Sequence, residues 1–277
     1  MTNWPSGING ARWESAGVSA ASTAGALLTA NAVANTVGNY AQLIAATAFH
    51  ASGIMLTLSN NNTAAATYLV DFAIGAAASE QILVSGLHSS TGGNANTTPV
   101  TAFFPLSIPA GSRLAARCQS STGGATIRLH GLLLGGGFGQ AIPGSIVDTY
   151  GANTADSGGT SIDPGATINT EGAWVEMTAT STRPYRAVLL GVGNQNNAAM
   201  STARWLFDIG VGAAGSEQVV VPDIMVGATA AEDNLFQLLF GPYPVDIPAA
   251  SRIAVRSQSG GNDATDRLLD AIVYGVS

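Results

Sequence analysis

Two pairs of carboxylates are the residues of this sequence whose type and spacing could do chemistry. Asp71 and Glu80 stand in the stretch DFAIGAAASEQILV, and Asp208 and Glu217 hold the same places in DIGVGAAGSEQVVV. Two carboxylates that flank a glycosidic bond, one protonated and one ionised, are the machinery of most glycoside hydrolases. The first pair could therefore belong to a carbohydrate-active enzyme.

Arginines that recur with these carboxylates favour a structural role instead. Arg113 and Arg117 follow the first stretch, and Arg252 and Arg256 follow the second. A nearby guanidinium favours the ionised carboxylate, whereas hydrolysis needs one protonated acid. We therefore predict ion pairs that join strands within one subunit or between two. The candidate pairs are Glu80 with Arg113 or Arg117, and Glu217 with Arg252 or Arg256, with Asp71 and Asp208 in the same sets.

The other chemical signals are weaker. GVGAAG, Gly210–Gly215, matches the G-x-G-x-x-G pattern, but a strand and a proline follow it where a dinucleotide site needs a helix, so we predict a tight turn. His50, His88 and His130 are far apart in the sequence, and Cys118 lies on the apolar side of its predicted strand. A site used by the first half alone stays open. We expect no catalytic residue, no cofactor and no metal, and hence no enzyme.

The whole chain reads as an internal duplication. ANTVGNYAQ from Ala34 returns as INTEGAWVE from Ile168, and PLSIPAGSRLAARCQS from Pro105 returns as PVDIPAASRIAVRSQS from Pro244 with ten of sixteen positions identical. Self-similarity at this spacing indicates two domains of ordinary size. We predict an N-terminal arm over residues 1–12, one copy over 13–136, a Gly/Pro linker over 137–146 and a second copy over 147–277.

Within each copy the apolar residues alternate with a period of two. Tyr68, Val70 and Phe72 share one face of YLVDFAI, and WLFDIGV repeats the pattern. Turn signals such as SNNNT and DPGA separate short runs of this kind. The pattern predicts an all-β fold: two tandem antiparallel β-sandwich domains, jelly-roll-like, with about eight strands each. One or two helical turns could fall between Ala16 and Ala34.

The charge is low and uneven. Charged residues make up 10% of the chain, and all ten basic residues are arginine. No basic run supports binding to nucleic acid, and no apolar stretch is long enough for a membrane helix. Residues 1–145 hold four arginines and three acids, whereas residues 146–277 hold six arginines and fourteen acids. We predict an elongated dumbbell, anchored through its first copy and displaying the acidic second copy.

The repeated stretches GAAxSEQ(I/V) and PxxIPAxSRxAxRxQS, in a lysine-free chain rich in Ala, Gly and Thr, resemble virion structural proteins of tailed bacteriophages. Head decoration, cement and fibre proteins of that group carry related stretches. The resemblance covers the middle and end of both copies, about half of the chain. It implies β-sandwich domains, trimers around a threefold axis and attachment to a capsid or tail shell, and it brings no catalytic residues.

These observations lead to one main hypothesis and two rivals. The chain is expected to be a homotrimeric capsid decoration or cement protein, assembled in the host cytoplasm, whose partners are itself and the major capsid protein or another shell protein. The second hypothesis is a fibre or a module that binds a host receptor or glycan through the acidic loops GATAAEDN, from Gly227, and SGGNDATD, from Ser259. The third is the carbohydrate-active enzyme.

Overall fold

The computed structural model describes residues 12–18, 24–60, 66–91, 100–136, 144–194, 203–228, 238–261 and 269–277. Every regular element in these residues is a β-strand, so the predicted all-β class is confirmed. The described part of Ala16–Ala34 forms a strand and turns, without the predicted helical turn. None of the described residues forms a helix able to cross a membrane.

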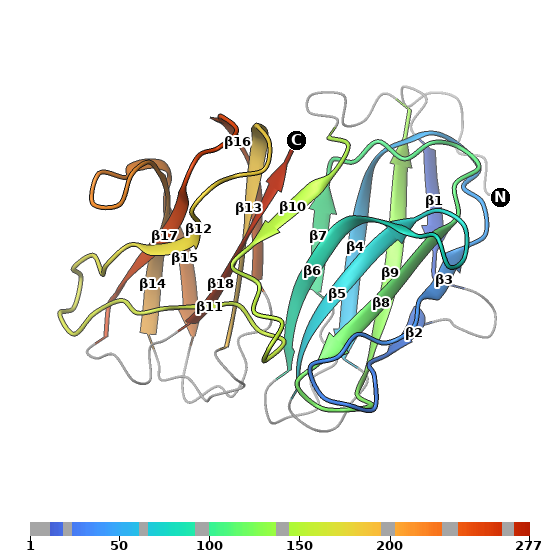
Figure 1. Ribbon diagram of the computed structural model, residues 1–277, viewed down its shortest axis with the longest axis horizontal. Coiled ribbons are helices and arrows are strands. Elements are labelled where there is room, and N and C mark those ends of the chain that lie inside the picture. Colours follow the sequence, from blue (N-terminus) through green and yellow to red (C-terminus); the bar gives the residue numbers. More distant parts are fainter. Residues whose placement is uncertain are drawn as a thin grey trace.

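The strands form three sheets (Figure 1). The first sheet has the order β1 (Arg12–Ala16), β9 (Thr126–Gly135), β4 (Ala51–Asn60) and β7 (Val100–Phe104), with β2 (Ala26–Thr29) also paired to β9. The second has the order β16 (Leu238–Ile247), β13 (Tyr185–Asn194), β18 (Leu269–Val276), β10 (Val147–Tyr150), β6 (Gln81–Thr91), β5 (Ala66–Ile74), β8 (Leu114–Ser120) and β3 (Ala41–Ile44), with β11 (Thr160–Ile162) also paired to β18. The third has the order β12 (Val175–Thr178), β17 (Ile253–Ser259), β14 (Ala203–Val211) and β15 (Gln218–Ala228).

The two halves of the chain have the same strand pairing. In the first half, the first sheet packs on β3, β8, β5 and β6; in the second half, the third sheet packs on β10, β11, β18, β13 and β16. The sandwich-like, antiparallel architecture thus agrees with the prediction. That one domain gave rise to both halves, with the predicted boundaries, stays a prediction.

Each half has nine strands in the described residues, where about eight are expected, because one strand is split in two. Both β1 and β2 pair with β9, and both β10 and β11 pair with β18. The break falls after a left-handed glycine, Gly17 or Gly151, each with φ of 84°. A Cβ at Gly17 would lie 2.8 Å from the Leu129 carbonyl oxygen, so the sharp bend requires glycine.

Alternation along the strands builds two apolar cores. Tyr68, Val70 and Phe72 of β5 are fully buried in the first core, and Trp205 and Phe207 of β14 are fully buried in the second. Asp71 lies between Val70 and Phe72, and Asp208 directly follows Phe207, so both carboxylates face the opposite side of the sheet. The period-two pattern therefore also places the carboxylates outside the cores.

The predicted dumbbell is wrong, because the halves share a sheet. Val147 of β10 pairs in parallel with Val84 of β6, and Figure 1 shows β10 lying between β18 and β6. Residues 137–143 of the predicted linker lie outside the described residues, while Gly144 bridges to Leu106 and Ser145 donates to the Ser277 carbonyl oxygen at 3.0 Å. The end of the linker is thus packed between the halves.

Tyr274 of β18 ties the halves together. Its hydroxyl accepts a hydrogen bond from the His88 amide at 3.0 Å and donates to the Gly86 carbonyl oxygen at 3.1 Å, both in β6. Its ring meets that of Phe104 edge to face, with centroids 6.1 Å apart. The first core accordingly includes residues of β13 and β18.

We expect Tyr274→Phe to lower the free energy of unfolding by about 1–3 kcal/mol, because it leaves a buried amide and a buried carbonyl without a partner. Tyr40→Phe is the control, since it removes a half-buried hydroxyl and keeps the ring; it should change stability by less than about 0.5 kcal/mol. Urea unfolding followed by fluorescence measures both. Equal effects of the two variants would contradict the role given to Tyr274.

Candidate functional site

The eight predicted site residues come together as four ion pairs. Arg113 lies 2.9 Å from Glu80, Arg117 2.9 Å from Asp71, Arg252 2.5 Å from Glu217, and Arg256 2.8 Å from Asp208. The alternatives left open by the sequence resolve in the same way in both halves. Each glutamate binds the first arginine of its half and each aspartate binds the second, all within one chain.

The first type of pair fastens a hairpin loop. Arg113 Nη1 donates to Glu80 and, at 3.0 Å, to the carbonyl oxygen of Gly75, and its Nε donates to Gln42 of β3 at 3.0 Å. Gly75 and Glu80 are the two ends of the loop between β5 and β6. One guanidinium at the start of β8 therefore fixes both ends of the loop and the neighbouring edge strand.

The second half repeats this clamp with one change. Arg252 Nη1 donates to Glu217 and, at 3.5 Å, to the Gly212 carbonyl oxygen, while its Nε donates to Glu176 of β12 at 2.7 Å. Glu176 corresponds to Gln42 in the repeated sequence, so the arginine binds a neutral amide in the first half and a charged carboxylate in the second. Part of the extra acidity of the second half thus belongs to the clamp.

Backbone geometry explains the repeated GAAxSEQ stretch. Gly75 and Gly212 have φ of 121° and 133°, which favours glycine, and the Ser79 and Ser216 amides donate to Ala76 and Ala213 at 3.0 and 2.9 Å. The hydrogen bonds that close the turn thus run through the serine amides. The glutamate directly precedes the first residue of β6 or β15, so the stretch is a joint at the start of a strand.

The second type of pair supports a bulge in the next strand. Asp71 accepts from Arg117 Nε at 2.9 Å and from the Gly86 amide at 3.1 Å; Asp208 accepts from Arg256 and, at 2.9 Å, from the Asp223 amide. Gly86 in β6 and Asp223 in β15 have left-handed backbones, with φ of 58° and 54°. The carboxylate thereby satisfies an amide that the bulge removes from the ladder.

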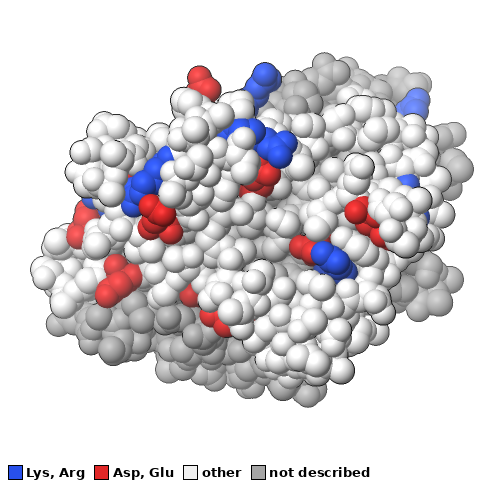
Figure 2. All heavy atoms as spheres, viewed as in Figure 1, with Lys and Arg blue, Asp and Glu red and all other residues white. Residues whose placement is uncertain are grey.

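An aromatic ring completes each of these pairs. The Arg117 guanidinium lies 4.7 Å from the centroid of the Tyr40 ring, and that of Arg256 lies 4.5 Å from the centroid of the Trp174 ring. Arg256 also pairs with Glu171 at 3.1 Å, a position held by a valine in the first half. Figure 2 shows one face of the molecule, on which acidic and basic side chains adjoin in a few groups on a largely uncharged surface.

These contacts keep the glutamates ionised. Desolvation works to raise the pKa of Glu80 and of Glu217, but hydrogen bonds from the backbone and from Arg113 or Arg252 outweigh it, and both pKa values are lowered. A general acid would need the opposite shift. The arrangement can join strands, and the lowered pKa values of Glu80 and Glu217 do not suit either glutamate to the role of general acid.

The histidines and the cysteine form no reactive cluster. Burial raises the pKa of Cys118 to about 12 and lowers that of the fully buried His88 to about 4, so the thiol and the imidazole are neutral near pH 7. Among the described residues, no three His, Cys, Asp or Glu side chains lie close enough to hold a metal ion.

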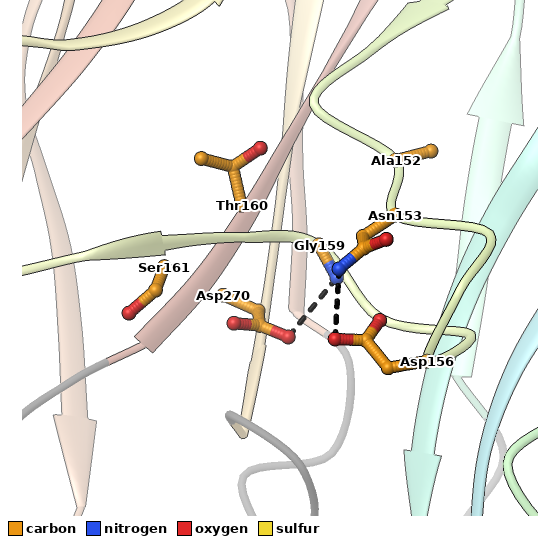
Figure 3. A pocket seen from close by; sticks show the side chains of 7 residues that line it. All are labelled: Ala152, Asn153, Asp156, Gly159, Thr160, Ser161 and Asp270. Carbon is orange, nitrogen blue, oxygen red and sulfur yellow. Dashed lines mark hydrogen bonds between the residues drawn. The ribbon is translucent and has the colours of Figure 1, made fainter.

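Sequence reasoning missed a polar pocket of about 440 Å³ on the second half (Figure 3). Asp270 Oδ2 accepts from the Gly159 amide at 3.0 Å, and Asp156 accepts from the Gly158 amide at 2.9 Å and from Asn153 at 2.8 Å. Burial, together with the charge of Asp156, raises the pKa of Asp270 to about 7 against the opposing bond from Gly159. A lone aspartate inside the apolar run LLDAIVY was the available signal.

No protein-family model and no curated protein matches the sequence. Among solved structures, PNGF-II matches at 10% identity and a TM-score of 0.36, over 86% of this chain and 59% of that one. The top component of cowpea mosaic virus, a naturally occurring empty particle, matches at 11% identity and a TM-score of 0.33, over 96% and 88%. The tandem CBM22 domains of Paenibacillus barcinonensis Xyn10C match at 8% identity and a TM-score of 0.28, over 97% and 91%.

A protein of a viral particle is thus among the structures similar to this chain, as is a tandem of CBM22 domains. This chain spans 59% of the length of the PNGF-II chain. At these identities and TM-scores the likeness concerns the all-β fold and carries no argument about activity, ligand or partner.

We expect Asp208→Asn to destabilise the protein by about 1–3 kcal/mol, because Arg256 then loses its buried charged partner. Asp71→Asn should cost less, since the Asp71 and Arg117 side chains are 15% and 27% exposed, against 6% and 23% for Asp208 and Arg256. Urea unfolding measures the difference. A larger loss at Asp71 would contradict the link between burial and the strength of the pair.

Asp270 should make the protein less stable as the pH rises. Its pKa in the folded chain, about 7, exceeds the ordinary value of 3.8, so its contribution is present below pH 3.8 and is lost as the pH rises through about 7. Asp270→Asn should therefore raise the melting temperature most at pH 8 and less at pH 5, and should change it little at pH 3.5, below the ordinary pKa of 3.8. Asp156→Asn should show a smaller gain, and parallel curves for all three chains would refute the assignment.

Proposed function

We propose that this chain is a non-enzymatic structural protein of a bacteriophage virion, a homotrimer that decorates or cements the capsid. The observation that carries the proposal is that the charged residues common to both halves bind one another. In each half the recurring carboxylates and arginines bind one another across strands, and so serve to fix the fold rather than to act on a substrate.

The mechanism proposed is contact area. Charged residues make up only 10% of the chain, so packing against a neighbour requires the desolvation of few charges. The cross-strand clamps are proposed to hold the strands in place when the shell exerts force on them. The first half, with four arginines and three acids, is proposed as the anchor on the shell. The acidic second half is proposed as the outer, solvated part.

A fibre or a glycan-binding module of the virion is the second candidate. The acidic loops named for it lie outside the described residues, apart from Gly227, Ala228 and Ser259–Gly261. The pocket of Asn153, Asp156, Thr160, Ser161 and Asp270 favours this candidate, because amides, hydroxyls and carboxylates are the groups that bind sugar hydroxyls.

The test adds the purified chain to capsids assembled without it. Saturable binding at regular lattice positions, seen by electron microscopy, together with a higher temperature of genome release, is the expected result. Location at the tail, or a monomer without affinity for capsids, would overturn the decoration role. Binding to host polysaccharide that Asp156→Asn abolishes would favour the second candidate.

A separate assay addresses catalysis. Asp71→Asn and Glu80→Gln should leave polysaccharide turnover at the background level of the parent chain, because their carboxylates are bound by Arg117 and Arg113. Turnover by the parent that either variant abolishes would return the enzyme hypothesis.

A further inference from the structure

The joint between the two halves is formed by two different surfaces. One is an edge of the first sandwich, made by β6 and β7. The other is the face of β13 and β18 that points away from the second core. Tyr274 enters the first core from that face, and the His88 ring packs so closely on Gly193 that a Cβ there would lie 2.3 Å from its Cε1.

Polar contacts flank this apolar joint. Gln119 of β8 donates to the Thr154 carbonyl oxygen at 2.9 Å and to the Ser157 hydroxyl at 3.0 Å. The Ser157 hydroxyl in turn donates to Asn35 at 2.9 Å. The amides of Gln119 and Asn35 therefore hold a loop of the second half on the first.

The same edge recurs on the second half, where nothing covers it within the described residues. In the repeated sequence Leu106 and Phe104, both fully buried, correspond to Val245 and Tyr243, which are partly exposed. The difference in exposure is largest within the strands. Leu69 pairs with His88 in the first half, and the corresponding residues Leu206 and Met225 pair in the second. His88 is 1% exposed and Met225 is 64% exposed.

The amides of the joint recur as well. Gln119 and Asn35 correspond to Gln258 and Asn169 in the repeated stretches. Asn169 is exposed and Gln258 half-exposed, and the side chain of neither makes a hydrogen bond within the described part of the chain. The second half thus has the two amide side chains that form the joint in the first half, but within the described residues they lack hydrogen-bond partners.

The covering face recurs on the first half. Leu189 pairs with Tyr274 in the second sheet as Met55 pairs with Leu132 in the first. Met55 and Leu132 lie partly exposed on the outer face of the first sheet, and Leu27, which is 44% exposed, pairs with Arg128 farther along the same strand, β9. Within the described residues these three apolar side chains stay partly or largely exposed, among polar neighbours such as Thr57 and His130.

We propose that the outer face of the first sheet receives the β15–β16 edge of a second copy of this chain, head to tail, as the halves meet within one chain. The charges favour contact between a first half and a second half over contact between two second halves. The first half carries four arginines against three acids and the second half six against fourteen, so two second halves would repel each other. Such a heterologous contact repeats, and it closes into a ring when the rotation permits.

The test measures the size of the full-length chain by sedimentation velocity over a range of concentrations. Met55→Asp removes the face and Met225→Asp removes the edge; Val33→Asp, at a residue 66% exposed and outside both surfaces, is the control. The parent and the control should assemble, and each of the other two variants should stay monomeric. Unchanged melting temperatures establish folding, and Leu27→Asp replaces Met55→Asp should that variant unfold.

Mixing decides between this geometry and a symmetric contact. An equimolar mixture of Met55→Asp and Met225→Asp chains keeps one intact edge and one intact face, so it should form heterodimers that grow no further. A monomeric parent, assembly of both variants like the parent, or a mixture that stays monomeric would overturn the inference. The inference does not rest on the proposed function: assembly without binding to capsids would remove that function and leave the head-to-tail contact standing.

Discussion

The structure depends on one constraint, which is that β18 and β13 need apolar cover on both faces. No residue of β18, LDAIVYGV, is exposed. Leu269, Ala271 and Val273 belong to the second core, whereas Ile272, Tyr274 and Val276 belong to the first. A second half on its own would place the latter group in water, at a cost of about 25 cal/mol for each Å² of apolar surface. The halves therefore form one body.

The arginine clamps act at hairpin loops and edge strands. Arg113 and Arg252 each join a loop to an edge strand, and edge strands otherwise present unpaired groups that invite wrong partners. Several of the few charged residues of this chain therefore lie at loops and edge strands. Ion pairs of this kind add little net stability, because desolvation offsets much of their attraction.

Sequence reasoning found what depends on local pattern. The alternation in YLVDFAI and WLFDIGV gives the strands, and the recurrence of Glu80 with Arg113 gives a member of a clamp, because both signals lie in residue type and spacing. It missed the shared sheet and the pocket at Asp270. The shared sheet depends on how β10 pairs with β6, a contact between halves that no periodicity within one strand encodes. The pocket depends on how the residues from Ala152 to Ser161 lie against Asp270, which is likewise a contact between segments far apart in the sequence.

The uneven charge follows from the same architecture. Glu171 and Glu176 take positions held by valine and glutamine in the first half, and both bind arginines of the clamps, so part of the extra acidity is neutralised locally. Asp223 and Asp246 are exposed on β15 and β16. Carboxylates at a sheet edge oppose pairing of that edge with itself. The charge thus limits which surface of a neighbour can cover the remaining apolar edge.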